Sequence, residues 1–466
     1  MKKILTLFVF ITSIVQAQYT IKGTMTPPEK SDWVILYKIE GAKQKFISNS
    51  TIKTETLNIG GQQQSVGRFE LQLPNDAKKG AYRVTYRDKG AGFVDFLFNK
   101  ENVEFVFNPQ YPDQSIVFTK SIENKVYREY LEAFTLSQSK IDDVQVKYLK
   151  VKDKGYKKEY KKAVAALEDV QDIYESKSKG MLANAFIKSS KNENASSIAE
   201  NTQDYLNSVV GNFFTNVDFK SDELYNSSFL IDKITDYVFL LNTSEDQNLQ
   251  QKLYKESITK VMGEIGSNKK LKKSASEFLI ERFTAARNSG IVDWLFADYY
   301  DQLPVSMQDA KFKKEKLDLL LASVGRIAPD FSWKEDGKDV SLSGLKDGEK
   351  YLIIFWSTQC SHCLQEIPEV YEFMKKEVST SIIAFAIEND ELDFNEFTKK
   401  LYGWHNVLGT HPEFRFNNET VQKYLITATP TYFVLDKNKK IIAVPNTMKD
   451  VKNYFTKGDV AAEPKK

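Results

Sequence analysis

The stretch of sequence that decides the fold of the C-terminal region is Phe355-Trp356-Ser357-Thr358-Gln359-Cys360-Ser361-His362-Cys363. Apolar residues at 351–356 predict a buried strand, and residues 360–377 predict a helix. The strand therefore delivers a C-x-x-C motif to the first turn of a helix. There, unpaired backbone N–H groups and the positive end of the helix dipole favour a thiolate. We expect Cys360 to act as a nucleophile, and Cys363, one turn later on the same face, to resolve the mixed disulfide.

A C-x-x-C pair can also be a static structural disulfide or half of a zinc site. The chain contains two Cys in all, so a zinc site would need His or carboxylate partners. Two Cys in an exported chain of this size do not make a disulfide scaffold either. The pattern favours a redox-active Cys360–Cys363 disulfide and predicts no metal site.

The composition excludes several classes of protein. The chain has 466 residues, and its 65 Lys and Arg nearly balance its 63 Asp and Glu. It therefore lacks the strong charge that binds nucleic acid or an anionic membrane. Hydrophobic residues make up 41% and aromatic residues 13%, which is too many for a disordered chain. At roughly 150 residues per domain, the length predicts about three domains.

The first 17 residues have the pattern of a secretory signal peptide. A basic start at Met1-Lys2-Lys3 precedes an apolar run at 4–15, and Ala17 is the small residue favoured before cleavage. The alternative is a membrane anchor, but this run is shorter than the roughly 20 residues that a spanning helix needs. We therefore expect export, with a soluble mature protein in the periplasm of a bacterium.

Two different regions are expected to follow the signal. Residues 18–120 predict an antiparallel β sandwich, because short alternating apolar runs are separated by Gly, Pro, Asn and Asp turns. Residues 121–322 predict a helical domain, because no proline lies between Pro112 and Pro304 and apolar residues recur every three or four positions. One helical face is marked by Tyr156, Tyr160, Val164, Leu167, Val170 and Tyr174.

Residues 323–460 change again, to alternating strands and helices, which is typical of an α/β layer. Strands are expected at 351–356, 381–387, 431–435 and 441–444, and helices at 360–377 and 394–402. Residues 461–466 are expected to be a frayed tail. The sequence therefore predicts a multidomain chain whose last domain carries the C-x-x-C motif.

Several motifs of this last domain resemble the TlpA/ResA-like branch of the thioredoxin superfamily. They are Arg326-Ile327-Ala328-Pro329-Asp330-Phe331, Val340-Ser341-Leu342-Ser343-Gly344-Leu345, the Phe355-Trp356 strand end, C-S-H-C, Glu366-Ile367-Pro368 and Ala428-Thr429-Pro430-Thr431-Tyr432-Phe433. The resemblance implies a thioredoxin fold and thiol-disulfide exchange without a cofactor. Residues 19–119 are more weakly similar to the β domain that often precedes such thioredoxins in bacterial envelope proteins. The helical middle is similar to the variable insert of those chains.

The resemblance assigns roles to three residues. Pro430 matches the cis-proline that packs against the active disulfide, where the alternative is an ordinary trans turn. Thr429 would present backbone groups to an extended substrate segment. Glu366 matches an acidic residue that this branch places beneath the cysteines, where a partly buried carboxylate can move the proton of Cys363. The alternative for Glu366 is an exposed first-turn carboxylate.

The sequence also departs from the common thioredoxin pattern. Gln359 replaces the Trp that often precedes the first Cys, while Trp356 keeps the interior aromatic position. Ile354 replaces the buried acid of ordinary thioredoxins, which leaves the proton-transfer role to Glu366. The Ser361-His362 pair resembles the motif of strongly oxidising proteins, in which an imidazole stabilises the thiolate.

We expect a periplasmic oxidoreductase that reduces disulfides of exported proteins, with electrons from a periplasmic or membrane donor. The alternatives are a dithiol oxidase or isomerase, a thiol peroxidase, and an envelope scaffold with an auxiliary thioredoxin domain. The peroxidase is disfavoured because Thr358 stands without the nearby Pro that peroxidases need. His405 and His411 are expected to be loop or packing residues.

Overall fold

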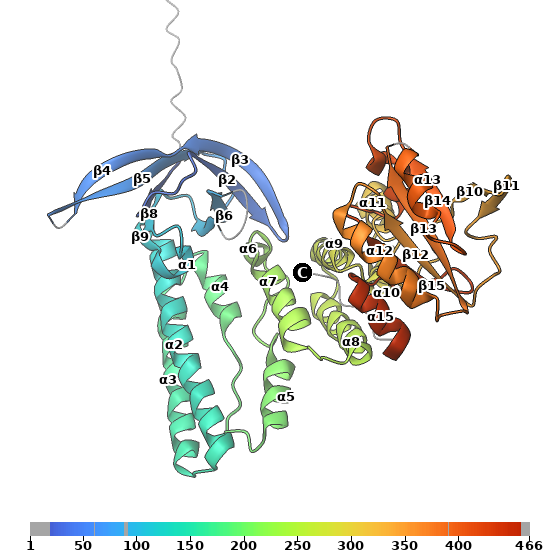
Figure 1. The fold of residues 1–466 in the computed structure, drawn as a ribbon. Helices are drawn as coiled ribbons and strands as arrows, with labels where there is room; N and C mark the ends of the chain where they lie inside the picture. The colour runs from blue at the N-terminus through green and yellow to red at the C-terminus, as the bar shows by residue number, and fades with distance from the viewer. Residues whose placement is uncertain (1–18, 60, 88–91, 390, 458–466) are drawn as a thin grey trace, which may run out of the picture. The chain divides into compact units, whose positions relative to one another are not determined.

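The computed structural model describes residues 19–59, 61–87, 92–389 and 391–457 (Figure 1). The predicted signal peptide, residues 1–17, and the predicted tail, residues 461–466, lie outside these ranges. The chain divides into two compact units, Met1–Ala275 and Ser276–Lys466. This boundary falls inside the predicted helical region, and the domain boundaries at residues 120 and 322 stay predictions.

The first unit begins with two β sheets. The strands are β1 (Tyr19–Met25), β2 (Trp33–Glu40), β3 (Lys43–Thr51), β4 (Lys53–Ile59), β5 (Gln62–Leu73), β6 (Gly80–Thr85), β7 (Phe93–Phe98), β8 (Val103–Phe107) and β9 (Val117–Lys120). One sheet has the order β4-β5-β1-β8-β9 and the other β3-β2-β6-β7, and side chains of both enter one aromatic-rich core. The alternating apolar runs of the sequence thus form strands with one buried face.

The prediction that these strands are all antiparallel is wrong at one pair. β1 and β8 run parallel, with Ile21 opposite Val103 and Met25 opposite Phe107. β7 and β8 belong to different sheets, so the chain crosses from one sheet to the other between them, and β8 then lies beside β1. Without a hairpin connecting the two strands, nothing in the connection imposes an antiparallel direction.

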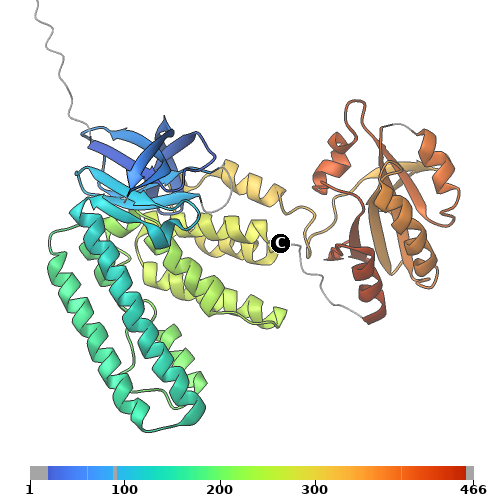
Figure 2. The same ribbon diagram turned by 60° about the vertical axis from the view of Figure 1, so that its left-hand side comes forward.

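Helices make up the rest of the first unit (Figure 2). They are α1 (Pro112–Ser115), α2 (Ile122–Val151), α3 (Gly155–Lys177), α4 (Ala183–Ser190), α5 (Thr202–Asn212), α6 (Asp222–Tyr225), α7 (Phe229–Thr235), a π-helix (Asp236–Leu241) and α8 (Gln247–Ile265). α2 and α3 form a long hairpin in which Tyr160 and Leu167, from the predicted apolar face, are buried. The helical periodicity of the sequence therefore identified the buried face of α3.

The second unit begins with further helices. α9 (Lys269–Ala285) crosses the boundary, and α10 (Ser289–Leu295), a π-helix (Phe296–Tyr300), a 3-10 turn (Val305–Met307) and α11 (Ala310–Asp318) follow. In the part of the chain that the structure describes, no helix combines the length and the apolar character needed to cross a bilayer.

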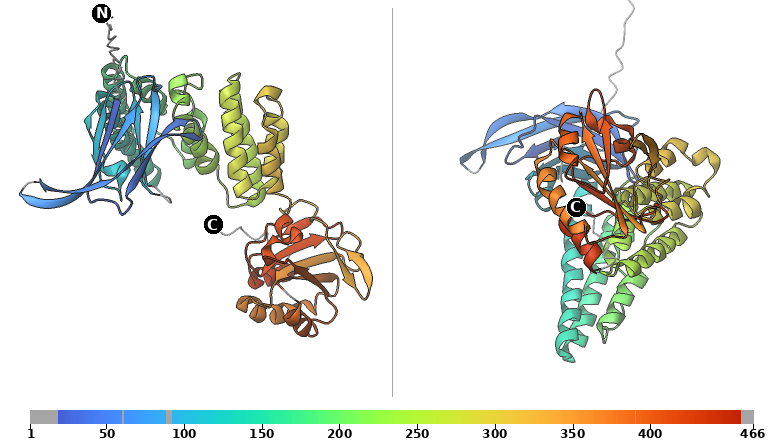
Figure 3. Two further views of the ribbon diagram at one scale, coloured as in Figure 1. Left: turned by 90° about the horizontal axis from the view of Figure 1, so that it is seen from above. Right: turned by 45° about the vertical axis from the view of Figure 1, so that its right-hand side comes forward.

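The C-terminal α/β domain has a central sheet with helices on its faces (Figure 3). A hairpin of β10 (Ser332–Glu335) and β11 (Lys338–Ser341) precedes the sheet. The sheet order is β14-β13-β12-β15-β16, in which β12 (Lys350–Trp356), β13 (Thr380–Glu388) and β14 (His405–Thr410) are parallel. β15 (Thr431–Asp436) runs antiparallel to β12, and β16 (Ile441–Ala443) runs antiparallel to β15. The helices are α12 (Ser361–Met374), α13 (Leu392–Thr398), α14 (Glu419–Lys423) and α15 (Met448–Lys457).

The residues of β12 alternate between two cores. Leu352, Ile354 and Trp356 face the core that contains α12, α13 and α15. Tyr351, Ile353 and Phe355 face the other core, with α14 and the β10–β11 hairpin. Because both faces of this strand are covered, its sequence is continuously apolar from Tyr351 to Trp356. Its last residue, Trp356, is fully buried shortly before the C-x-x-C motif.

Candidate active site

The C-x-x-C motif lies where β12 ends and α12 begins. Trp356, the last strand residue, is fully buried and packs against Phe397 with ring centroids 4.9 Å apart. Cys360 is the N-cap residue of α12, and its Sγ accepts a hydrogen bond from the Cys363 N–H at 3.3 Å. The helix is shorter than predicted: it begins at Ser361 and ends at Met374. Cys360 thus takes the extended backbone of a cap instead of the helical one.

The two cysteines, both free thiols here, occupy different environments. Cys360 is partly exposed, whereas Cys363 is 0% exposed. Desolvation opposes a thiolate at Cys360. However, hydrogen bonds from Cys363, the Thr429 side chain and the Cys363 and His362 N–H groups outweigh it and lower its pKa. Desolvation, and then the neighbouring Cys360, raise the pKa of Cys363 to about 12. These environments favour a thiolate at Cys360, the form that attacks a disulfide, and keep Cys363 protonated as a thiol.

Thr429, which the resemblance assigned to substrate binding, lies beside Cys360. The Thr429–Pro430 peptide bond is cis, and the Cys360 thiol donates a hydrogen bond to the Thr429 carbonyl at 3.3 Å. Both residues are half-buried and directly precede β15. A main-chain carbonyl next to the nucleophile is where an extended substrate segment would pair.

Glu366 has a partner that the sequence did not predict. The Tyr432 hydroxyl donates a hydrogen bond to Glu366 Oε2 at 2.8 Å. Tyr432 is fully buried in the core that also contains Cys363. Desolvation raises the pKa of Tyr432, and the charges of Glu366, Cys363 and Cys360 raise it further, so the hydroxyl stays protonated. Tyr432 therefore lies in the electrostatic environment of both the carboxylate and the two sulfurs.

Ser361 and His362 are exposed in the first turn of α12. The contribution of His362 to the Cys360 thiolate comes from its backbone N–H group. A role for either side chain in tuning the redox pair stays a prediction.

Sequence reasoning missed two residues next to the motif, Glu388 and Arg415. Glu388 ends β13 and is 1% exposed, and its carboxylate accepts hydrogen bonds from Thr358 and Ser357. Arg415 donates to Ser357 and Gln359. A signal for Glu388 existed: an acidic residue directly follows the apolar strand expected at 381–387, and the carboxyl ends of parallel strands meet at one edge of a sheet.

His405 is a packing residue, as expected, but with two charged partners. Its Nδ1 lies 2.7 Å from Glu335 and its Nε2 2.8 Å from Asp347. The ring packs against Trp333 with centroids 5.7 Å apart. Desolvation lowers the pKa of His405, but hydrogen bonds to Asp347 and Glu335 outweigh it, so the pKa is raised. His411 lies in a loop, where its Nδ1 accepts hydrogen bonds from the Glu413 and Phe414 N–H groups.

The His405 cluster predicts a pH-dependent stability. A folded-state pKa above the unfolded value of about 6.5 means that protonated His405 stabilises the fold at low pH. This contribution is complete below about pH 6.5 and is lost as pH rises through the folded-state pKa. We expect the Tm difference between wild type and His405→Gln to be largest near pH 6 and to shrink towards pH 9. Calorimetric scans across this range check the prediction, and parallel Tm curves would contradict it.

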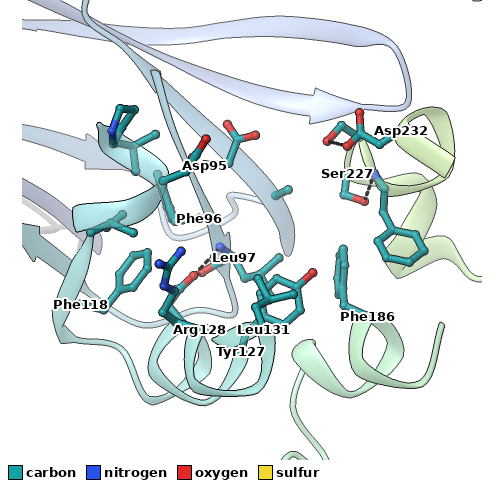
Figure 4. A pocket seen from close by; sticks show the side chains of 18 residues that line it. Asp95, Phe96, Leu97, Phe118, Tyr127, Arg128, Leu131, Phe186, Ser227 and Asp232 are labelled. Carbon is teal, nitrogen blue, oxygen red and sulfur yellow. Dashed lines mark hydrogen bonds between the residues drawn. The ribbon is translucent and has the colours of Figure 1, made fainter. Parts of the chain in front are cut away.

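The N-terminal unit contains a cavity of about 240 Å³ between β7, α2 and α7 (Figure 4). Its walls carry the aromatic rings of Phe96, Phe118, Tyr127, Phe186 and Phe229. Two carboxyls also line it: Asp95, which is paired with Arg83 at 2.7 Å, and Asp232, which accepts from Ser228 at 2.7 Å. None of its lining residues is Cys or His, so this cavity supplies no group for thiol chemistry. Among the described residues, no cluster of three His, Cys, Asp or Glu side chains is arranged to hold a metal ion.

Comparisons with known proteins agree with this geometry. The Redoxin family model matches residues 323–457. Thiol-disulfide oxidoreductase ResA of Bacillus thuringiensis subsp. konkukian is 28% identical over 133 residues, covering 28% of this chain and 70% of the relative. ResA of Geobacillus thermodenitrificans is 27% identical over 140 residues, covering 28% of this chain and 76% of the relative.

The C-terminal domain is a TlpA/ResA-like thioredoxin domain. It is a thioredoxin-like thiol-disulfide oxidoreductase, as the sequence predicted. A similar solved structure is the thioredoxin domain of a thiol-disulfide oxidoreductase from Bacteroides vulgatus. That domain is 25% identical with a TM-score of 0.26, and the match covers 29% of this chain and 96% of that domain. These matches leave the residues before the TlpA/ResA-like domain without an assigned activity.

Proposed function

We propose that this chain is an exported, periplasmic oxidoreductase that reduces disulfides of other exported proteins through Cys360 and Cys363. The observation that carries the proposal is the asymmetry of the pair: Cys360 is partly exposed with a lowered pKa, and Cys363 is buried with a raised pKa. An outer thiolate and an inner thiol are the arrangement needed for two successive attacks. The signal-like pattern of residues 1–17 supports export.

The reaction would proceed in two displacements. The Cys360 thiolate attacks one sulfur of the substrate disulfide, forming a mixed disulfide and releasing the first substrate thiolate. Cys363 then loses its proton and attacks Cys360 Sγ, which closes the Cys360–Cys363 disulfide and releases the second substrate thiolate. Two electrons pass from the dithiol to the substrate. A periplasmic or membrane-bound thiol donor would return the chain to the dithiol form.

Side chains around the pair would support these steps. Glu366 would accept the proton of Cys363, with Tyr432 holding the carboxylate in place at 2.8 Å. The Thr429 carbonyl would pair with the substrate backbone beside the attacked sulfur. Residues 18–120, proposed as a β sandwich, and residues 121–322, proposed as a helical domain, would then present substrates to this site or tether it.

The equilibrium reduction potential of the pair tests the direction of electron flow. We expect a value near or below about −230 mV in the signal-free protein titrated against thiol buffers, as a reductase requires. A value of about −120 to −180 mV would instead establish the oxidase or isomerase, which the His362 position favours. Rapid peroxide consumption would support the peroxidase. Full cellular function of a Cys360→Ser/Cys363→Ser variant would support the scaffold.

A further inference from the structure

Glu388 is a buried carboxylate positioned by strand register. β12 and β13 are parallel with Trp356 opposite Ala386, so two residues further along each strand Thr358 and Glu388 meet. There the Thr358 N–H donates to Glu388 Oε1 at 2.5 Å, and the Ser357 hydroxyl donates to Glu388 Oε2 at 3.2 Å. Desolvation raises the pKa of Glu388, and these hydrogen bonds and Arg415 counteract the rise. The carboxylate therefore bonds the segment that leads into the motif.

Arg415 bonds the same segment. It begins a 3-10 turn (Arg415–Asn417), and its Nη1 donates to Ser357 Oγ at 2.7 Å and to Gln359 Oε1 at 3.0 Å. The Gln359 N–H also donates to Ser357 Oγ, at 3.1 Å. Ser357, which is 1% exposed, thus accepts two hydrogen bonds and donates one to Glu388. Its buried hydroxyl therefore forms hydrogen bonds with both an acidic side chain, Glu388, and a basic one, Arg415.

Ser357 in turn contacts both cysteines through its backbone. Its carbonyl accepts the Cys360 N–H at 3.2 Å, which closes the turn before α12. Its own N–H forms a hydrogen bond with the Cys363 sulfur that favours the thiolate. Any change in the orientation of Ser357 would therefore shift the cap position of Cys360 and the donor at Cys363. The hydrogen bonds of Glu388 and Arg415 described above all go to residues 357–359 and not to either sulfur.

We propose that Glu388 and Arg415 are positioning residues of the redox site, which hold Ser357–Gln359 in the one conformation that presents Cys360 at the N-terminus of α12. This inference rests on the proposed exchange chemistry at Cys360 and extends it to residues beyond the motif. Burying a carboxylate is costly unless it is hydrogen-bonded or paired. Here its hydrogen bonds are made to the segment that leads into the nucleophile.

The pH dependence of Cys360 alkylation by iodoacetamide in the reduced full chain tests the proposal. Arg415→Met removes the guanidinium group of a half-buried side chain, so we expect this variant to fold. We expect it to raise the midpoint of the profile by about 0.5 to 1 pH unit, because a misplaced cap loses N–H donors to the thiolate. Glu388→Ala should give a similar rise. Glu388→Gln keeps an acceptor for the Thr358 N–H and should restore most of the wild-type midpoint.

The combined Glu388→Ala/Arg415→Met variant is expected to shift the midpoint no further than the larger single shift, since both residues act through Ser357. Glu372→Gln, which removes an exposed carboxylate on α12 paired with Lys375, is the control and should leave the midpoint unchanged. A lower midpoint in Glu388→Gln would overturn the proposal in favour of simple charge repulsion. An unchanged midpoint in Arg415→Met would also overturn it. Alkylation needs no substrate protein, so failure of the wild type to exchange disulfides would defeat only the proposed function.

Discussion

Cys360→Ser is expected to abolish disulfide exchange, with a loss of at least about 10³-fold in the rate of reduction of a protein disulfide. The reason is that Cys363 cannot replace it: Cys363 is fully buried and its pKa is raised to about 12. A thiol with that pKa contributes almost no thiolate at neutral pH, and a substrate sulfur cannot reach it. Insulin reduction, monitored by turbidity with a dithiol donor, measures the loss.

Cys363→Ser separates the two displacement steps. We expect this variant to retain the first attack, because Cys360 keeps its exposure and the Thr429 contact. Without the resolving thiol, the mixed disulfide should accumulate and appear as a reducible adduct on a non-reducing gel. Gln365→Ala, which changes an exposed residue of α12 two positions after Cys363, is the matched control and should turn over normally. An adduct on Cys360→Ser instead would reverse the assigned roles.

Glu366→Gln is expected to slow the second displacement by about 10²-fold at neutral pH, which is a typical contribution of a general base. Cys363 must lose a proton before it attacks, and burial keeps that proton firmly bound. Glutamine retains the hydrogen bond from Tyr432 but cannot accept the proton. Quenched-flow measurement of the mixed disulfide should therefore show normal formation and slow decay.

A neighbouring carboxylate on the same helix provides the control for Glu366. Glu369 is exposed and paired with Lys452 at 3.3 Å, so Glu369→Gln should leave the decay unchanged. Raising the pH should partly restore the Glu366→Gln variant, because hydroxide then removes the proton that the carboxylate no longer accepts. If both variants decayed at the wild-type rate, proton transfer by Glu366 would be ruled out.

Much of the thioredoxin domain was predictable from its sequence because the relevant signals are local. The apolar run at 351–356 became β12 with both faces covered, and the C-x-x-C motif lies at the first turn of α12, as expected. The helix begins one residue later than predicted because Cys360 is a cap, a distinction that apolar periodicity cannot make. The parallel pairing of β1 and β8 was missed because it depends on how the chain crosses between sheets.

The sequence alone indicated the chemistry of this protein: two Cys separated by two residues, at the end of a buried strand and the start of a helix, predict a nucleophile and a resolving thiol. Only the tertiary structure decided which side chains control them. Glu388 lies 31 positions from Ser357 along the chain, and Tyr432 lies 66 positions from Glu366. Hydrogen bonds between such distant residues are set by strand register and core packing, and a local sequence pattern contains neither.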